Sequence, residues 1–86
     1  MRLIVSPAAL KTMARVMPEQ DRDRLLQKAE VFAANPFATH PSATPLHGEP
    51  NRVRIRQGDW RGIALIVRDR DVVILERVGH RREVYR

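Results

Sequence analysis

The stretch NRVRIRQGDWRGIALIVRDRDVVIL, residues 51–75, decides the fold. Within it, residues 52–56 alternate arginine with valine or isoleucine, which is the period of a half-buried β-strand. Successive side chains of a strand point to opposite faces of its sheet. We therefore expect an arginine face and an apolar face on this strand, formed by Arg52, Arg54 and Arg56 and by Val53 and Ile55 respectively.

Two apolar runs follow this strand. Residues 63–67 are apolar at every position, as in a central strand covered on both sides, and residues 72–75 repeat the pattern. Gly58-Asp59 before the first run is typical of a tight hairpin, and residues 68–71 form a second polar turn. The stretch is therefore predicted to form an antiparallel meander.

The two turns also predict which residues lie opposite one another. A loop at Gly58-Asp59 places Arg56 opposite Arg61, and because paired residues point to the same side of a sheet, Arg61 joins the arginine face. A second loop at residues 69–70 predicts two further pairs on that face, which are Arg61 with Val78 and Ile63 with Glu76. The last strand then leads into a polar run beside Arg61, made of Gly79, His80 and Arg81.

The first part of the chain predicts one short strand and two helices. Residues 2–5 are apolar enough for a strand, and Ser6-Pro7 then offers an N-cap hydroxyl and a proline where no N–H is needed. Apolar residues continue at helical spacing, interrupted at Pro18, and Asn35-Pro36 ends the pattern. We expect a helical hairpin over residues 7–34 that packs on the apolar sheet face, which also carries Trp60.

These elements together predict the fold class. Helices followed by strands, with one strand at the start, indicate an α+β fold in which the helical hairpin covers a twisted antiparallel sheet. The chain of 86 residues is short enough for a single domain, residues 1–86. Residues 35–50 contain four prolines and a glycine and are read as a connector.

Composition excludes several classes of function. The chain has no cysteine, which excludes disulfides, a thiol nucleophile and cysteine-ligated zinc. Its three histidines, His40, His47 and His80, show no metal-ligand spacing, so we expect neither a metal nor a cofactor. Residues 2–5 are too short for a signal-peptide core, and no run approaches the roughly 20 apolar residues that span a bilayer. We expect a cytoplasmic protein with no membrane partner.

The charge is basic and uneven. The net charge is +6, and residues 44–86 hold ten Lys and Arg against six Asp and Glu, all ten being arginine. Arginine stays protonated and grips phosphate with a planar fork, so the second half favours a phosphate-bearing partner. A solvated surface that meets an acidic protein partner is the alternative.

The order and spacing of several short motifs resemble the RelE/ParE superfamily of bacterial and archaeal type II toxins. The superfamily pattern is a Leu-x-Gly, an Arg-x-Arg strand, a Gly-Asp-aromatic-Arg turn, an apolar hairpin and a terminal Val-Gly-x-Arg-x-x-x-Tyr. The matching positions are Leu46 and Gly48, Arg54 and Arg56, Gly58-Asp59-Trp60-Arg61, Val78-Gly79-His80-Arg81 and Tyr85. The match covers about half of the chain closely.

The resemblance implies a function for the arginine face. RelE-like members enter the ribosomal A site and cut mRNA there, and an antitoxin encoded beside them holds them inactive. The toxin reaches promoter DNA only through that antitoxin. Carried over, the functional residues are Arg54, Arg56, Arg61, Arg81 and Tyr85.

Metal-free RNA cleavage uses the 2′-OH of the RNA as its nucleophile and requires stabilised charge at phosphorus. Arg61 and Arg81 are the expected phosphate clamps. The RNA backbone would be held by Arg52, Arg54 and Arg56. Relatives often carry lysine where Arg54 and Arg56 stand, and arginine barely deprotonates, so this strand is a poor place to expect the general base.

Proton transfer then has two main candidates. Tyr85 would act if surrounding cations lower its pKa, or it would stack on a base. His80 would act because imidazole gives and takes protons near neutrality. Glu49 and Glu76 could also serve as a base or orient an arginine, although such glutamates are more often structural ion-pair partners.

Two other functions remain open at this point. One is a ParE-like protein that poisons DNA gyrase by binding it, without nuclease activity. The other is a degenerate toxin or a basic RNA-binding module that has no activity of its own. The grouping of His80, Arg81 and Tyr85 after the last strand favours the nuclease.

Overall fold

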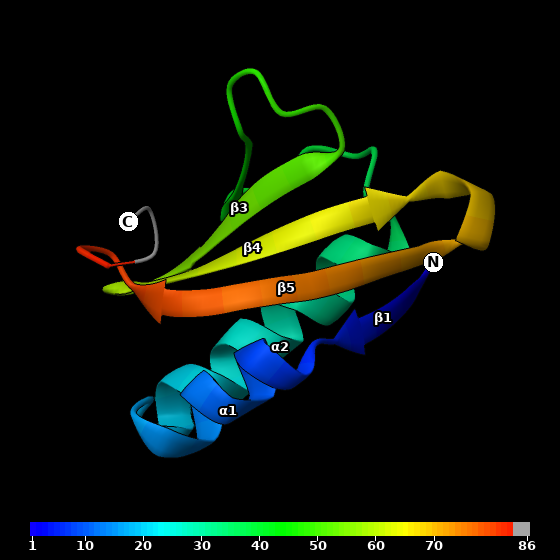
Figure 1. The fold of residues 1–86 in the computed structure, drawn as a ribbon. Helices are drawn as coiled ribbons and strands as arrows, with labels where there is room; N and C mark the ends of the chain where they lie inside the picture. The colour runs from blue at the N-terminus through cyan, green and yellow to red at the C-terminus, as the bar shows by residue number, and fades with distance from the viewer. Residues whose placement is uncertain (84–86) are drawn as a thin grey trace.

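The computed structural model describes residues 1–83 and shows an α+β fold, which confirms the predicted class. Two helices cover one face of a five-stranded sheet whose strand order is β1-β5-β4-β3-β2 (Figure 1). The elements are β1 (Arg2–Val5), α1 (Pro7–Arg15), α2 (Glu19–Ala34), β2 (Ala43–Pro45), β3 (Arg52–Gln57), β4 (Trp60–Val67), a 3-10 turn (Arg68–Arg70) and β5 (Val72–His80). No helix within residues 1–83 is long and apolar enough to cross a membrane.

The sheet is mixed rather than wholly antiparallel. β2, β3, β4 and β5 pair antiparallel, as predicted for the meander, but β1 pairs with β5 in parallel. Parallel neighbours need a long crossover connection, and here both helices and the rest of the sheet lie between them in the chain. The prediction of an antiparallel sheet is therefore wrong for this one pairing.

The proline-rich connector contains a strand that the sequence did not predict. β2 pairs with β3 at the edge of the sheet, with Pro45 opposite Val53. Proline is tolerated in an edge strand because it removes only one donor at the margin of the ladder. Because of its prolines, this segment was predicted to be a connector rather than a strand.

The first helix begins where the sequence predicted. The Ser6 hydroxyl accepts a hydrogen bond from the Ala9 N–H at 3.0 Å, which caps the helix. The same hydroxyl donates to the Glu76 carbonyl at 2.6 Å. The cap thus ties the start of α1 to the middle of β5.

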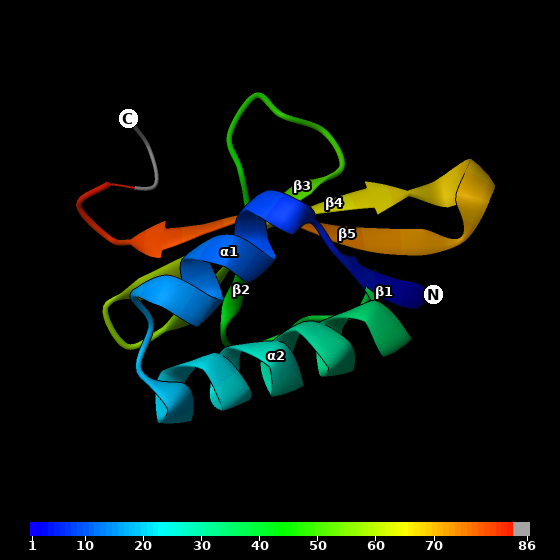
Figure 2. The ribbon, with the colours of Figure 1, turned by 60° about the horizontal axis from the view of Figure 1, so that its bottom comes forward.

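The core lies between the helices and the sheet (Figure 2). α2 contributes Leu25, Ala29 and Phe32, all buried. Val53 and Ile55 of β3 are buried beneath them, and Trp60 packs partly buried against the same cluster. The prediction that the helical hairpin covers this sheet face is confirmed.

A β-bulge in β5 changes the predicted register. The predicted pairs hold from Val67–Val72 to Ala64–Leu75, but Ile63 then lies opposite Arg77. Glu76 is the extra residue of the bulge, so each later partner is displaced by one. The predicted pairs Arg61–Val78 and Ile63–Glu76 are therefore wrong, and Arg61 lies opposite Gly79.

Gly62 is required where β4 meets the core, because an added Cβ would lie 2.9 Å from Cδ1 of Leu75 and 3.6 Å from Cδ1 of Leu25. Both leucines are fully buried and cannot swing away freely. We expect Gly62→Ala to lower the free energy of unfolding by about 1–3 kcal/mol, the usual cost of overpacking a core. Urea unfolding measures it, and an unchanged midpoint would show that Leu75 can repack without loss.

Candidate functional site

The sheet face opposite the helices, here called the open face, carries the arginines that the sequence placed there. Arg52 and Arg54 are half-buried and Arg56 is exposed, while Val53 and Ile55 between them are buried toward the helices. Arg56 lies directly opposite Arg61, which confirms that predicted pair. The open face is formed by Arg52, Arg54 and Arg56 of β3, Arg61 of β4, and Glu76 and Arg77 of β5.

Arg77 is the open-face cation that sequence reasoning missed. Arg54, Ile63 and Arg77 lie in one row across the three central strands. The bulge at Glu76 brings Arg77 into this row, whereas an unbroken ladder would place Glu76 there. Nothing in the sequence marks the bulge, so no local signal could have found Arg77.

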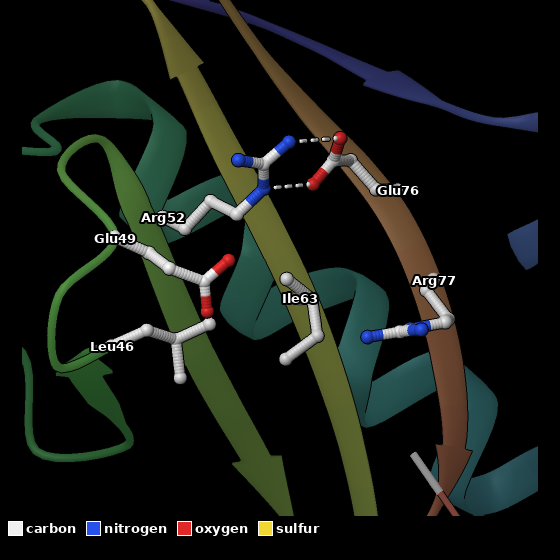
Figure 3. Close-up of a pocket in the computed structure, with 6 residues that line it drawn as sticks. All are labelled: Leu46, Glu49, Arg52, Ile63, Glu76 and Arg77. Atoms are coloured by element: carbon white, nitrogen blue, oxygen red, sulfur yellow. Dashed lines mark hydrogen bonds and ion pairs between the residues drawn. The ribbon is translucent and has the colours of Figure 1, made fainter. Parts of the chain in front are cut away.

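One arginine of the open face is already engaged by a carboxylate. Arg52 Nε donates to Glu76 Oε1 at 2.8 Å and Arg52 Nη2 donates to Glu76 Oε2 at 3.2 Å (Figure 3). This bidentate hydrogen bond, together with the carboxylate charge, raises the pKa of Arg52 above its ordinary value. The structure thus gives Glu76 the ion-pair role and makes Arg52 a rigid wall of the face.

Removing the Glu76 charge tests this ion pair. We expect Glu76→Gln to lower the urea midpoint slightly, and we expect about 1 M salt, which shortens the Debye length to about 3 Å, to abolish the difference. A raised pKa of Arg52 contributes stability at every pH below the pKa of arginine in the unfolded chain, which is far above neutrality. The stability lost in Glu76→Gln should therefore be constant between about pH 6 and 9. Glu30→Gln on α2 is the charge-matched control, and an equal loss there would contradict the ion pair.

A hollow of about 500 Å³ lies between β3 and β5 on the open face. Ile63 forms its floor, and Glu49 and Arg77 extend toward each other across that floor from opposite sides (Figure 3). Glu49 comes from the β2–β3 loop and Arg77 from β5. The residues that line the hollow are Leu46, Glu49, Arg52, Ile63, Glu76 and Arg77.

The two predicted phosphate clamps meet at the β3–β4 turn. Arg61 Nη1 donates to the carbonyls of Gly58 at 2.6 Å and Trp60 at 2.8 Å. The Arg81 N–H donates to the Asp59 carbonyl at 2.7 Å, and its Nε lies 3.6 Å from Asp59 Oδ1. Because both arginines are anchored to one tight turn, two guanidinium groups are held at the same end of the sheet.

His80 does not lie on the open face. It lies opposite Trp60, and the two rings meet edge-on with centroids 5.7 Å apart. His80 also borders a hollow of about 330 Å³ beside Ala8, Thr12 and Val16, so its side chain is on the side of α1. The bulge is the cause, because a shift of one residue moves a side chain to the other face.

Tyr85, the other candidate for proton transfer, lies outside the described residues. Across residues 1–83 no group of His, Cys, Asp or Glu side chains is arranged to hold a metal ion. What the described site offers is fixed positive charge, with carboxylates at its margin. That arrangement is suited to holding a phosphate chain and developing negative charge.

Comparison with known proteins adds a family and a fold. A family model described as ParE toxin of type II toxin-antitoxin system, parDE, matches residues 3–85. The isolated E. coli RelE toxin is 24% identical with a TM-score of 0.76, over 98% of this chain and 89% of that one. The matching chain of the archaeal RelE-RelB complex from Pyrococcus horikoshii is 19% identical with a TM-score of 0.77, over 95% of this chain and 96% of that one. No curated protein matches the sequence significantly.

Proposed function

The chain belongs to the ParE toxin family of type II toxin-antitoxin systems, and we propose that it acts as a ribosome-dependent mRNA endonuclease. The observation that supports the proposal is the convergence of Arg61 and Arg81 on one turn at the end of an arginine-lined sheet face. Such a face is better suited to binding a single RNA strand than to binding a flat protein surface, because guanidinium groups bind phosphate bidentately.

In the proposed reaction the RNA supplies its own nucleophile. The 2′-oxygen attacks the adjacent phosphorus, the bond from phosphorus to the 5′-oxygen breaks, and a 2′,3′-cyclic phosphate and a 5′-hydroxyl result. Arg61 and Arg81 stabilise the additional negative charge on the phosphate oxygens. Arg54 and Arg56 hold the flanking backbone, and Arg52, paired with Glu76, limits the face at its far end.

One proton must leave the 2′-OH and another must reach the 5′-oxygen. Arginine does neither at any pH near neutrality. The proposal assigns these transfers to Tyr85 and His80, the two candidates of the C-terminal run. Since His80 packs against Trp60 on the side of α1, Tyr85 is the stronger of the two.

A cognate antitoxin is the proposed protein partner. Similar structures include complexes described as RelB-RelE antitoxin-toxin from Methanococcus jannaschii and the RelBE toxin-antitoxin complex from E. coli. The net charge of +6 and the arginines of the open face favour an acidic antitoxin segment that covers this face. Contact with promoter DNA would then run through the antitoxin alone.

A second candidate is inhibition of DNA gyrase without nuclease activity. The matching family is described by its ParE members, and the His80 ring packs on Trp60 on the opposite side of the sheet from Arg61, which weakens a metal-free acid–base mechanism. In that case the arginine face would bind the target and perform no chemistry.

Mapping of mRNA ends in a cell-free translation reaction separates the two candidates. We expect purified toxin to create new 5′ ends at codon-phased positions with ribosomes present and none on naked mRNA. Addition of the antitoxin should abolish the cuts. If folded toxin produces no cuts but blocks supercoiling by gyrase, the nuclease proposal is wrong and the second candidate holds.

A further inference from the structure

The hollow on the open face has a composition that phosphate binding does not explain. Its floor is Ile63, which is only 3% exposed, and one wall is a carboxylate, Glu49, which would repel a phosphate. We propose that this hollow is a subsite for a nucleotide base of the RNA strand, and that Glu49 selects guanine. The inference rests on the proposed function, since it concerns the substrate held by the same face.

The hollow lies one step along the sheet from the clamp. Arg56 and Arg61 form one row across β3 and β4, and Arg54, Ile63 and Arg77 form the next row on the same face. Residues two apart on a strand are separated by about 7 Å. A nucleotide whose phosphate lies at Arg61 can therefore place its own base, or that of a neighbour, over Ile63.

The hollow also has the size of a ligand site. Its volume of about 500 Å³ falls within the roughly 300–1,000 Å³ of small-molecule pockets. Leu46, which is partly exposed, offers apolar contact to the face of a base, as single-stranded RNA recognition uses, while Ile63 closes the hollow from below. The Arg77 guanidinium, opposite Glu49, can stack on the ring or donate to its acceptor atoms (Figure 3).

Glu49 is the acceptor that remains available. Both oxygens of Glu76 already accept a hydrogen bond from Arg52. Among the interactions of residues 1–83, none pairs the Glu49 carboxylate with a hydrogen-bond donor, although its charge acts on nearby Arg52. A carboxylate that faces a hollow in this way accepts two parallel hydrogen bonds from a ligand.

Only one base offers two such donors side by side. Guanine presents N1–H and the N2 amino group on its Watson–Crick edge, which match the two carboxylate oxygens. Adenine and cytosine each present one amino group beside an unprotonated ring nitrogen, and uracil presents one N–H between two carbonyls. Each of these places an acceptor against the carboxylate or leaves one of its oxygens without a donor, so each forms fewer hydrogen bonds to Glu49 than guanine does.

Nucleotide titration of the purified toxin, followed by amide NMR, tests the inference without ribosomes or cleavage. We expect guanosine 5′-monophosphate to shift the Ile63 and Arg77 amides and to bind at least about tenfold more tightly than the adenosine, cytidine and uridine monophosphates. Inosine monophosphate, which lacks the N2 amino group, should bind like these three. Glu49→Gln should remove the preference, and Glu30→Gln, its charge-matched control on α2, should retain it.

Equal binding of all four nucleotides, or shifts confined to the amides around Arg61 and Arg81, would overturn the inference and leave a phosphate clamp alone. A Glu49→Gln variant that keeps the guanine preference would also overturn the inference. If that variant also binds the antitoxin more weakly, the hollow is instead a site for a basic side chain of the antitoxin. Failure of the nuclease proposal is separately visible, because guanine binding without mRNA cuts contradicts only the proposed reaction. Cuts without a guanine preference contradict only the subsite.

Discussion

Arg81→Ala is expected to lower the rate of mRNA cleavage on the ribosome by roughly 10²–10³-fold, the usual cost of removing one preorganised donor to transition-state charge. Arg81 is held at the β3–β4 turn by its backbone N–H, so truncation of its side chain leaves that anchor in place. Its side chain is 52% exposed and its contact with Asp59 is long at 3.6 Å. The fold should therefore be unaffected while the clamp loses one of its two charges.

The matched control is Arg70→Ala, which removes the same charge from the exposed turn at the opposite end of β4 and β5. Primer-extension counts of new 5′ ends, at equal ribosome and toxin concentrations, measure the effect. We expect near-parental cleavage from Arg70→Ala and a urea midpoint for Arg81→Ala equal to that of the parent. If Arg81→Ala and Arg70→Ala both cleave at the parental rate, Arg81 is not part of the site. If both variants lose the same amount of cleavage, the effect is a general one of net charge.

Phe32→Ala is expected to lower the free energy of unfolding by about 3–5 kcal/mol, which is the cost of truncating a large buried aromatic residue. Phe32 is 2% exposed and belongs to the core through which α2 packs on the sheet. Domains have roughly 0.05–0.15 kcal/mol of stability per residue, or about 4–13 kcal/mol for a chain of 86 residues. The variant is thus expected to retain between about zero and 10 kcal/mol and to unfold at a clearly lower urea concentration than the parent.

Phe37 offers the control for that experiment. It lies five residues later, is 58% exposed, and its ring meets only the Arg68 guanidinium among the ring and cation contacts of the described residues, at 4.4 Å. Phe37→Ala should cost about 0.5–1 kcal/mol, the worth of an exposed cation–π contact. Urea unfolding of both variants gives the comparison, and similar losses would mean that Phe32 does not lie in the core.

The two main variants distinguish loss of chemistry from loss of structure. Both should weaken toxicity in cells, Arg81→Ala through slower cleavage by a folded chain and Phe32→Ala through a larger unfolded fraction. A partner that binds the folded state stabilises it by mass action, so the antitoxin should raise the unfolding temperature of Phe32→Ala. Arg81→Ala should be as stable as the parent without the antitoxin, and its cleavage should remain slow although the chain is fully folded.

Much of the fold was predictable because its signals are local. The alternation at residues 52–56, the Gly58-Asp59 turn and the Ser6-Pro7 helix start each depend on neighbouring residues, and the structure confirms all three. β2 was missed because its sequence, which includes Pro45, has no strand pattern of its own. The strand forms through its pairing with β3. The parallel β1–β5 pair was missed because pairing across the chain has no local pattern.

In the candidate site, the positions of the positive charges and the shared face of Arg52, Arg54, Arg56 and Arg61 were predictable, because a period of two and a tight turn are enough to define that face. The residues that β5 contributes to the face were not predictable from local patterns. One extra residue at Glu76 turned Arg77 onto the open face, placed His80 against Trp60 and allowed Glu76 to reach Arg52. At the bulge, the Glu76 carbonyl accepts a hydrogen bond from the Ser6 hydroxyl, which caps α1. Contacts of this kind come from distant parts of the chain, so the residues of β5 alone do not specify the bulge.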